Sequence, residues 1–400
     1  MLRDKEFDFS SKLRQGSVIE RLKEYIDWQR NLRNSGSGSI PIWAPVSINM
    51  DLTSACNFAC PHCVDSGIIH KSYSLDTETI KKSIDILKKN GLLSVILIGG
   101  GEPTMHRDFE EIATYIKQKG LQLGVATNGS DLKRLMRVAD IFEKGDWVRL
   151  SLDSANEDTF VASHRPPKNV TLKGILDDAR VLKKANKDIS LGYSFVIVWP
   201  GIHMNGQELA SNIDQMAKAA YLAKKYDFDF ISFKPCLVRL EDSKKEALVD
   251  DKDRQKLAQV ASDIAKGLEE VRSGDHPKVL ESVNLRAMLQ DRVEELEKQP
   301  KTCHMQFFRT VLSPFGIYLC TAFRGVDSAL IGGPDGYSDQ AKLEETLHRL
   351  ERSIKDFDAS KECRQVACFY HHVNWWIENF IESGNDVETL ERLEDDNFFL

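Results

Sequence analysis

The stretch Cys56-Asn-Phe-Ala-Cys60-Pro-His-Cys63 decides the fold, because it places three thiols within one short loop. Thiolates at positions i, i+4 and i+7 can converge on a single centre. A structural zinc ion would require a fourth ligand, for which His62 and His70 are the local candidates. A cubane iron–sulfur cluster held by three cysteines leaves one iron open for chemistry. The residues alone leave both alternatives open, and we favour the cluster.

The residues around this loop form a strand–loop–helix pattern. Apolar and polar residues alternate over 46–52, which predicts a strand, and residues 76–91 carry the apolar face and terminal glycine of a helix. With its CX3CX2C spacing in this position, the triplet resembles the radical S-adenosylmethionine (radical SAM) superfamily. The resemblance implies that Cys56, Cys60 and Cys63 hold a [4Fe-4S] cluster and that S-adenosylmethionine binds its open iron.

The alternation of strands and helices continues along the chain. Apolar runs predict further strands at 94–98, 121–126, 147–152, 189–198 and 228–233. Amphipathic patterns between them predict helices. Repeated βα units with right-handed crossovers form a parallel sheet that curls towards a barrel. We therefore expect an α/β fold with a partial (βα)6 TIM-like barrel at residues 46–235, whose chemistry lies at the carboxyl ends of the strands.

A glycine run, Gly99-Gly-Gly-Glu-Pro103, follows the second predicted strand. Glycines after a strand are common in turns, and neither nucleotide-binding pattern, GxGxxG or GK[ST], is present. The run resembles the GGE motif of the radical SAM superfamily. The resemblance implies that Gly100, Gly101 and Glu102 receive the amino group of the methionine moiety.

Five further residues are candidates for binding the cofactor. Relatives bind the methionine carboxylate and the ribose hydroxyls at the ends of the third and fourth strands, where this chain has Thr127, Asn128, Ser151 and Asp153. Arg165 follows the fourth strand and could pair with the carboxylate through two hydrogen bonds. The alternatives are an Asn-Gly turn, a helix amino-terminal cap and an exposed surface arginine.

Four cysteines in the last hundred residues make one complete coordination set: Cys303, Cys320, Cys363 and Cys368. Their placement around a predicted hairpin and before a helix resembles the short SPASM domain called twitch, which implies a second, auxiliary [4Fe-4S] cluster. Relatives more often have four residues between the hairpin glycine and its cysteine, whereas three separate Gly316 from Cys320. A zinc ion held by four thiolates is the alternative. The long SPASM form needs seven cysteines, so the count excludes another auxiliary cluster.

The remaining segments give the domain organisation. We expect an N-terminal helix and linker at 1–45, the helix starting at a Ser17-x-x-Glu20 capping box. A helical linker region at 236–300, charge-rich over 239–256, precedes a small α+β domain at 301–400 that carries the auxiliary site. Cys236 ends the sixth strand at the presumed active site, where it could donate hydrogen; an inert buried thiol is the alternative.

Composition limits the class of protein. Hydrophobic residues make up 42% of the 400-residue chain and no apolar run could span a bilayer, so we expect a cytoplasmic protein without a membrane partner. The net charge of −7 disfavours a nucleic-acid partner. Eight cysteines in a reducing compartment are not expected to form disulfides.

The resemblance also implies a function. We expect an oxidoreductase-type radical SAM enzyme that cleaves S-adenosylmethionine to a 5′-deoxyadenosyl radical and takes hydrogen from a peptide or protein, leading to oxidation, a crosslink or epimerisation. A flavodoxin- or ferredoxin-type protein would donate the electron. The alternatives are the same chemistry on a small-molecule substrate, such as a sugar or cyclitol, and a non-catalytic iron–sulfur or zinc scaffold.

Overall fold

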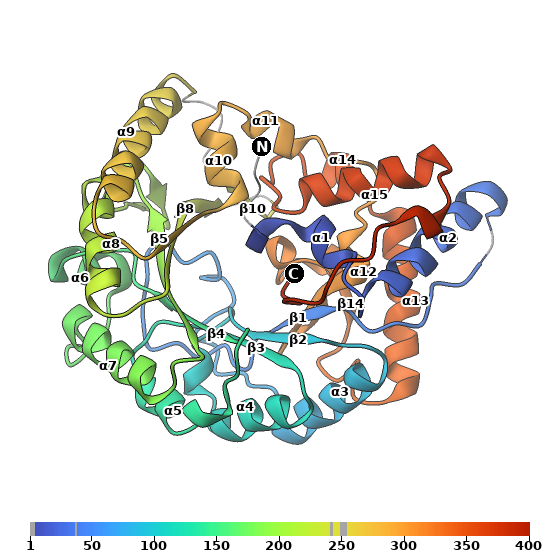
Figure 1. Ribbon diagram of the computed structural model, residues 1–400, viewed down its shortest axis with the longest axis horizontal. Coiled ribbons are helices and arrows are strands. Elements are labelled where there is room, and N and C mark those ends of the chain that lie inside the picture. The colour runs from blue at the N-terminus through green and yellow to red at the C-terminus, as the bar shows by residue number, and fades with distance from the viewer. Residues whose placement is uncertain (1–4, 37, 241–242, 249–253) are drawn as a thin grey trace.

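A ten-stranded sheet organises the chain, and most of its strands run parallel (Figure 1). The computed structural model describes residues 5–36, 38–240, 243–248 and 254–400. The strands follow the order β11-β8-β5-β4-β3-β2-β1-β12-β13-β14. Their bounds are Ser47–Met50 (β1), Ser94–Leu97 (β2), Gln122–Thr127 (β3), Trp147–Ser151 (β4), Ser190–Ile197 (β5), Phe230–Pro235 (β8), Lys278–Glu281 (β11), Arg309–Ser313 (β12), Gly316–Tyr318 (β13) and Leu330–Gly332 (β14).

Helices between the parallel strands cover the outer face of the curved sheet (Figure 1). Every neighbouring pair from β11 to β12 is parallel, as right-handed βα units require. This confirms the predicted α/β partial barrel. The helices of this layer are α3 (Thr77–Lys89), α4 (Phe109–Gln118), α5 (Leu132–Met136), α6 (Glu157–His164), α7 (Leu172–Ala185) and α8 (Met216–Lys225).

The strands have one apolar and one polar face. Side chains alternate along a strand, so every second residue points to the same side. The residues that face the helices are fully buried and apolar: Ile48, Met50, Val95, Leu97, Leu123, Val125, Val148, Leu150, Leu191, Tyr193, Ile231 and Phe233. The residues between them face the barrel interior and include Asn49, Ser94, Arg149, Ser194, Ser232 and Lys234. The interior is therefore polar, unlike the packed apolar centre of a closed barrel.

The C-terminal third joins the same sheet, because β12 pairs in parallel with β1. β13 and β14 extend the sheet antiparallel. The N-terminal helices α1 (Phe9–Leu13) and α2 (Ile19–Ser35) pack against α15 (His371–Ser383). The other helices of this part are α9 (Arg254–Ser273), α10 (Val283–Leu289), α11 (Val293–Glu297), α12 (Met305–Phe308), α13 (Gln340–Asp356) and α14 (Ala359–Glu362).

The last residues of the chain cross the amino-terminal ends of the strands. Ser94 Oγ donates to the carbonyl of Phe398 at 2.9 Å, and the backbone N–H of Phe398 donates to Gln122 Oε1 at 2.8 Å. The Phe399 ring meets the Trp147 ring edge to face, with centroids 5.5 Å apart. These contacts close the end of the barrel opposite to the carboxyl ends of the strands.

Several local predictions are wrong. Ser17 does not cap α2: its hydroxyl donates to Asp395 at 2.5 Å, and the helix begins at Ile19 without a side-chain cap. The sequence of the helical linker region predicts one helix over 282–298, whereas the structure divides it into α10 and α11 and adds the unpredicted strand β11 before them. The predicted hairpin has a return strand over 317–323 that contains Cys320, whereas β13 ends at Tyr318 and Cys320 lies beyond it.

The charge-rich segment 239–256 is partly described. Residues 241–242 and 249–253 lie outside the described residues. Around the first gap, β9 (Leu237–Arg239) pairs antiparallel with β10 (Glu246–Leu248), so the segment is not a plain linker. A second short hairpin joins β6 (His203–Met204) to β7 (Gln207–Glu208).

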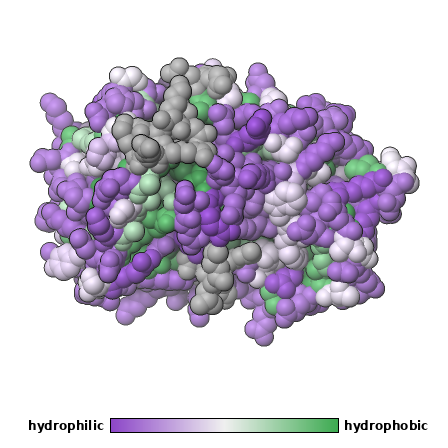
Figure 2. Space-filling view, turned by 90° about the horizontal axis from the view of Figure 1, so that it is seen from above, coloured by the Kyte–Doolittle hydropathy of each residue, from purple (hydrophilic) through white to green (hydrophobic). Residues whose placement is uncertain are grey.

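Among the described residues, no helix is long and apolar enough to cross a membrane. The face drawn in Figure 2 is largely hydrophilic, with hydrophobic residues visible mainly in a hollow between hydrophilic ones.

Candidate active site

The cysteine triplet lies on the loop that follows β1, at the carboxyl ends of the parallel strands. A backbone hydrogen bond from Cys63 to the carbonyl of Cys60, 3.2 Å long, folds the loop into a turn. Burial raises the pKa of Cys60 well above its usual value, and the neighbouring charges of Cys63 and Cys56 raise it further. Three crowded, half-buried thiols fit a metal cluster, because binding a metal as thiolates removes both the repulsion between them and the cost of an unpaired charge.

The glycine run lies directly against this loop. Gly99 and Gly100 have φ values of 77° and 62°, a region that favours glycine. A Cβ atom on Gly101 would lie 2.1 Å from the carbonyl oxygen of Ala55. The N–H groups of Gly101 and Glu102 donate to the carbonyls of Thr53 and Ala55, both at 2.8 Å. The motif therefore holds the cysteine loop through its backbone.

Glu102 is buried and joins the ends of β2 and β3. Its Oε1 accepts hydrogen bonds from the Thr104 hydroxyl at 2.7 Å and the Thr127 hydroxyl at 2.6 Å. Its Oε2 accepts from the backbone N–H of Asn128 at 2.7 Å. Burial raises the pKa of Glu102, while these hydrogen bonds oppose the rise. The carboxylate therefore fixes Thr127 and Asn128, two of the predicted cofactor-binding residues.

Asn128 connects this corner to the cysteines. Its side chain donates to Asn57 Oδ1 at 2.9 Å, and Asn57 donates in turn to the Ser130 hydroxyl at 2.9 Å. Burial raises the pKa of Cys56, and a hydrogen bond from Asn128 partly offsets that effect. The structure thus brings the triplet, the glycine motif and the end of β3 into one site.

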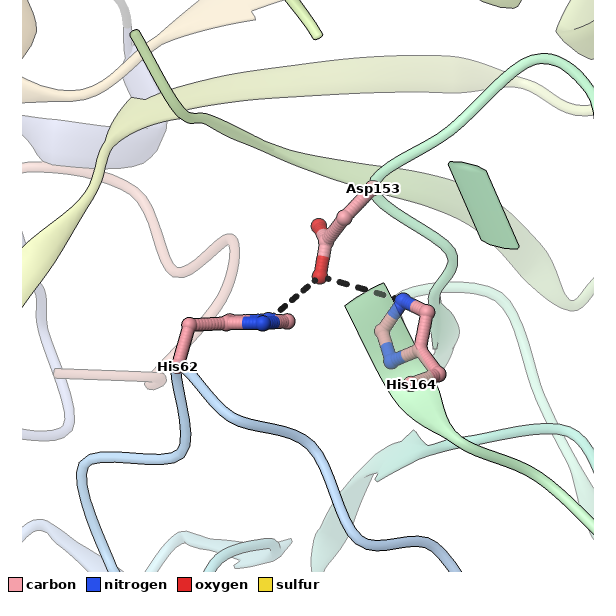
Figure 3. Close-up of side chains that lie close together, drawn as sticks. All are labelled: His62, Asp153 and His164. Carbon is pink, nitrogen blue, oxygen red and sulfur yellow. Dashed lines mark hydrogen bonds and ion pairs between the residues drawn. The ribbon is translucent and has the colours of Figure 1, made fainter. Parts of the chain in front are cut away.

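Asp153 follows β4 and lies between two histidines (Figure 3). Its Oδ2 is 3.2 Å from His62 Nε2 and 3.4 Å from His164 Nε2, and its Oδ1 accepts from the N–H of Val196 at 2.7 Å. Burial works to raise the pKa of Asp153, but the His62 hydrogen bond and the histidine charges outweigh it and lower the pKa. The carboxylate is therefore ionised.

His164 links Asp153 to the triplet. Its Nδ1 lies 3.3 Å from Cys60 Sγ, and its Nε2 lies 2.9 Å from the carbonyl of Leu152. Burial lowers the pKa of His164 to about 4. Sequence reasoning missed this residue and considered His62 only as a zinc ligand. Nothing in the spacing indicates His164, which is 104 residues away from Cys60 in the chain.

Three other candidates occupy different environments. Ser151 is half-buried on β4, two residues before Asp153. Arg165 is exposed at the end of α6 and donates to Gln207, so the structure places it at the surface rather than in the barrel. Cys236 is buried in the hydrophobic core, and burial raises its pKa to about 12. Its thiol is therefore protonated.

The second cysteine set lines a single cavity in the C-terminal part, together with residues of β12 and α15. Burial raises the pKa of Cys303 to about 12, with a further contribution from Cys320. The same two effects, burial and the other three thiols, raise the pKa of Cys363. Four thiols that line one cavity are a donor set that suits an iron–sulfur cluster, with zinc as the alternative.

Polar groups support this cavity. Asn374 Nδ2 lies 3.9 Å from Cys303 Sγ. Burial lowers the pKa of Arg309 to about 10, and the charge of Cys320 opposes this decrease. Arg309 also donates to Asn49 Oδ1 on β1 at 2.7 Å. A guanidinium beside the four thiols suits a site that carries negative charge when its thiols are ionised.

Comparison with known proteins matches the barrel to one family. The model of the Radical SAM superfamily matches residues 50–213. The S-adenosylmethionine-dependent nucleotide dehydratase of Selenomonas ruminantium is 37% identical over 116 residues, 29% of this chain and 42% of that protein. The mycofactocin maturase MftC of Mycolicibacterium smegmatis is 32% identical over 187 residues, 46% of this chain and 43% of that protein. The chain thus spans about two fifths of these relatives.

Solved structures share the fold over most of the chain. Streptococcus suis SuiB bound to S-adenosylmethionine matches with a TM-score of 0.59 and 13% identity, covering 92% of this chain and 80% of that chain. SuiB bound to the precursor peptide SuiA matches with a TM-score of 0.57 and 13% identity, covering 91% and 78%. At this identity the likeness shows the fold.

Proposed function

Because residues 50–213 match the model of the Radical SAM superfamily, we propose that this protein cleaves S-adenosylmethionine reductively and takes hydrogen from a peptide substrate. The observation that carries the proposal is the joint placement of three elements. The cysteine triplet, the glycine motif with Glu102, and Asp153 all lie at the carboxyl ends of neighbouring parallel strands. Barrels of this type have their chemistry at that end.

Cys56, Cys60 and Cys63 would hold a [4Fe-4S] cluster, and their donor chemistry suits it. When bound, the cluster supplies S-adenosylmethionine with the electron that releases methionine and a 5′-deoxyadenosyl radical, which abstracts hydrogen. The Cys60 sulfur would be oriented by His164, whose Nδ1 lies 3.3 Å away.

Residues around the triplet would seat S-adenosylmethionine. Gly100 and Gly101 offer backbone without side chains next to the cysteine loop. Glu102 places negative charge beside them, favouring an ammonium group. The ionised Asp153, with Ser151 two residues before it, would accept hydrogen bonds from ribose hydroxyls. Because Arg165 contacts Gln207 at the surface, we give it no part in this site.

The four C-terminal cysteines would hold an auxiliary [4Fe-4S] cluster, with zinc as the alternative. The polar neighbours Asn374 and Arg309 support an anionic centre there. An external flavodoxin- or ferredoxin-type donor would supply electrons, and the overall reaction would be of the oxidoreductase type. Cys236 is proposed to be inert, because its buried thiol is protonated and remains in the core.

The peptide substrate is supported by one relative and one protein of similar fold. MftC is a maturase, and SuiB shares the fold and has been crystallised with a precursor peptide. The nucleotide dehydratase relative supports a small-molecule substrate as the second candidate.

The test is a metal count followed by an activity assay. Protein purified without oxygen should contain about eight irons and eight sulfides per chain. With dithionite and S-adenosylmethionine it should form 5′-deoxyadenosine, and Cys56→Ala should form none while keeping about four irons. Four irons in the wild type, lost on Cys56→Ala, would contradict the auxiliary cluster. Absence of 5′-deoxyadenosine under strong reductants would contradict the enzyme.

A further inference from the structure

Two basic side chains face the interior of the barrel. Arg149 lies on β4 between Val148 and Leu150, which are fully buried against the helices. Lys234 lies on β8 next to Phe233, which is also fully buried on the helix side. Because side chains alternate along a strand, Arg149 and Lys234 point into the polar interior.

Neither side chain has an acidic partner within the described ranges. Arg149 Nε is buried and makes no hydrogen bond, and the guanidinium lies 5.3 Å from the centroid of the Trp147 ring. Asp153 is the one negative charge that acts on either side chain, and it raises the pKa of both Arg149 and Lys234. It does not pair with the lysine, because its oxygens already contact His62, His164 and Val196.

These unpaired charges destabilise the folded chain. Burial lowers the pKa of Lys234 to about 7, and the charge of Arg149 contributes to the decrease. Burial also lowers the pKa of Arg149 to about 10. Both side chains are half-buried, and a cation in such a place loses part of its hydration, which a bound anion would offset. Basic side chains with lowered pKa values and no acidic partner indicate a binding site.

Strand register places the two cations along the wall of the interior. Lys234 pairs with Val196, and the N–H of Val196 donates to Asp153. The backbone of Lys234 therefore lies level with Asp153 along the barrel axis. Arg149 pairs with Gly192, deeper in the barrel. The ring of Trp147 occupies the space left by Gly124 beneath it. The pair therefore runs from the proposed S-adenosylmethionine site towards the barrel floor.

We propose that Arg149 and Lys234 bind a carboxylate of the substrate, so that the protein acts on a peptide with an acidic residue at or next to the reacting position. The peptide class rests on the proposed function. The net charge of the chain is −7, so this basic interior is a local feature rather than a property of the whole molecule. A guanidinium and an ammonium facing one interior suit a carboxylate.

The test measures binding rather than turnover. The probes are a blocked pentapeptide with one central glutamate among glycines, the same peptide with glutamine, inorganic phosphate, and S-adenosylmethionine. Each is titrated calorimetrically into the anaerobically purified protein, the first three with S-adenosylmethionine present. The variants are Arg149→Gln and Lys234→Met, with Arg149→Lys as the conservative change. Lys184→Met, an exposed lysine on α7, is the matched control.

The wild type and Lys184→Met should bind the glutamate peptide about tenfold more tightly than the glutamine peptide, as one charge-assisted contact provides. Arg149→Gln and Lys234→Met should lose this preference and Arg149→Lys should keep most of it. Binding of S-adenosylmethionine should change less than about twofold in every variant.

Two results would overturn the proposal. If S-adenosylmethionine binds about tenfold more weakly in Arg149→Gln and Lys234→Met, the bound carboxylate belongs to the cofactor. If phosphate binds and the glutamate peptide shows no preference, the ligand is a phosphorylated metabolite. Failure of the proposed function is seen separately, as absence of 5′-deoxyadenosine from a wild type that still prefers the glutamate peptide.

Discussion

The absence of a side chain at Gly101 allows the glycine motif to lie directly against the cysteine loop. Its backbone runs beside the cysteine loop, and the N–H groups of Gly101 and Glu102 hold Thr53 and Ala55. Any side chain at this position would overlap the carbonyl of Ala55, which is backbone and cannot turn aside. The distance between the glycine motif and the triplet is therefore set by the absence of a Cβ.

Gly101→Ala should lower the free energy of unfolding by about 3 kcal/mol, the upper range for overpacking a tight site. It should also reduce the iron content, because the cysteine loop must move away. Gly67→Ala is the control within the same loop, since nothing lies within 4 Å of its added Cβ. Urea unfolding and iron analysis of both variants test this, and equal stability of the two would refute the close contact.

At the residue scale, the sequence predicts contacts between residues of one loop better than contacts that only the fold creates. Cys56 and Cys60 could be recognised as one site because their spacing lies within a single loop. The partner of Cys60, His164, could not, because only the fold brings α6 to that loop. The surface position of Arg165 could not be predicted either, because its contact with Gln207 is made only in the fold.

At the scale of elements, one arginine joins the two cysteine regions. Arg324 follows the loop of Cys320 and is 5% exposed. Its Nε lies 2.8 Å from Asp51 at the end of β1, and its Nη1 lies 2.9 Å from Asp65, two residues after Cys63. The guanidinium also packs on Gly99. The ion pairs therefore fix the auxiliary region against the cofactor motifs.

Arg324→Met should destabilise the protein by about 3–5 kcal/mol, because it leaves Asp51 buried without its cation and Asp65 with only the longer contact to Arg239, 3.5 Å away. Arg349→Met is the control, since its pair with Glu345 on α13 is exposed and should contribute about 0.5 kcal/mol or less. Thermal unfolding of the anaerobic protein measures both. A loss of similar size in the two variants would contradict the buried network.

Asp51 also predicts a dependence of stability on pH. Burial raises its pKa from 3.8 to about 7, although Arg324 opposes the rise. The folded protein thus binds this proton more tightly than the unfolded chain, so the contribution is complete below pH 3.8 and is lost as the pH rises through about 7. Between pH 5.5 and 8, unfolding midpoints should fall less steeply in Asp51→Asn than in the wild type. Parallel slopes would refute this.

The elements themselves were predictable to different degrees. Strands such as β2 and β5 are buried on their helix-facing side and give clear apolar patterns. β11 was missed, because four residues between charged segments give too short a pattern, and its pairing with β8 is a tertiary contact. The prediction of a capping box at Ser17 was wrong for a similar reason. The Ser17 hydroxyl donates to Asp395, which is far away in the sequence.

At the scale of the whole molecule, the barrel carries the candidate site at the carboxyl ends of its strands and is closed at the opposite end, its floor. The polar interior needs such a floor, because solvent entering from below would weaken every charge interaction inside. The C-terminal residues provide it by pairing with Gln122 and Ser94 and by placing Phe399 beside Trp147. Lys12 from α1 donates to the carbonyl of Phe399 from the other side. Both ends of the described chain thus stabilise one surface.

Phe399→Ala should therefore cost about 3–4 kcal/mol, the range for removing a buried aromatic ring. Because Trp147 lies beneath Arg149, opening the floor should also expose the interior, so that acrylamide quenches tryptophan fluorescence more strongly than in the wild type. Val161→Ala, an exposed residue on α6, is the control and should change neither property. If Phe399→Ala unfolds like the wild type and its tryptophan quenching is unchanged, the tail does not close the barrel. A loss of stability without added quenching would mean that the ring stabilises the fold while other residues exclude water from the interior.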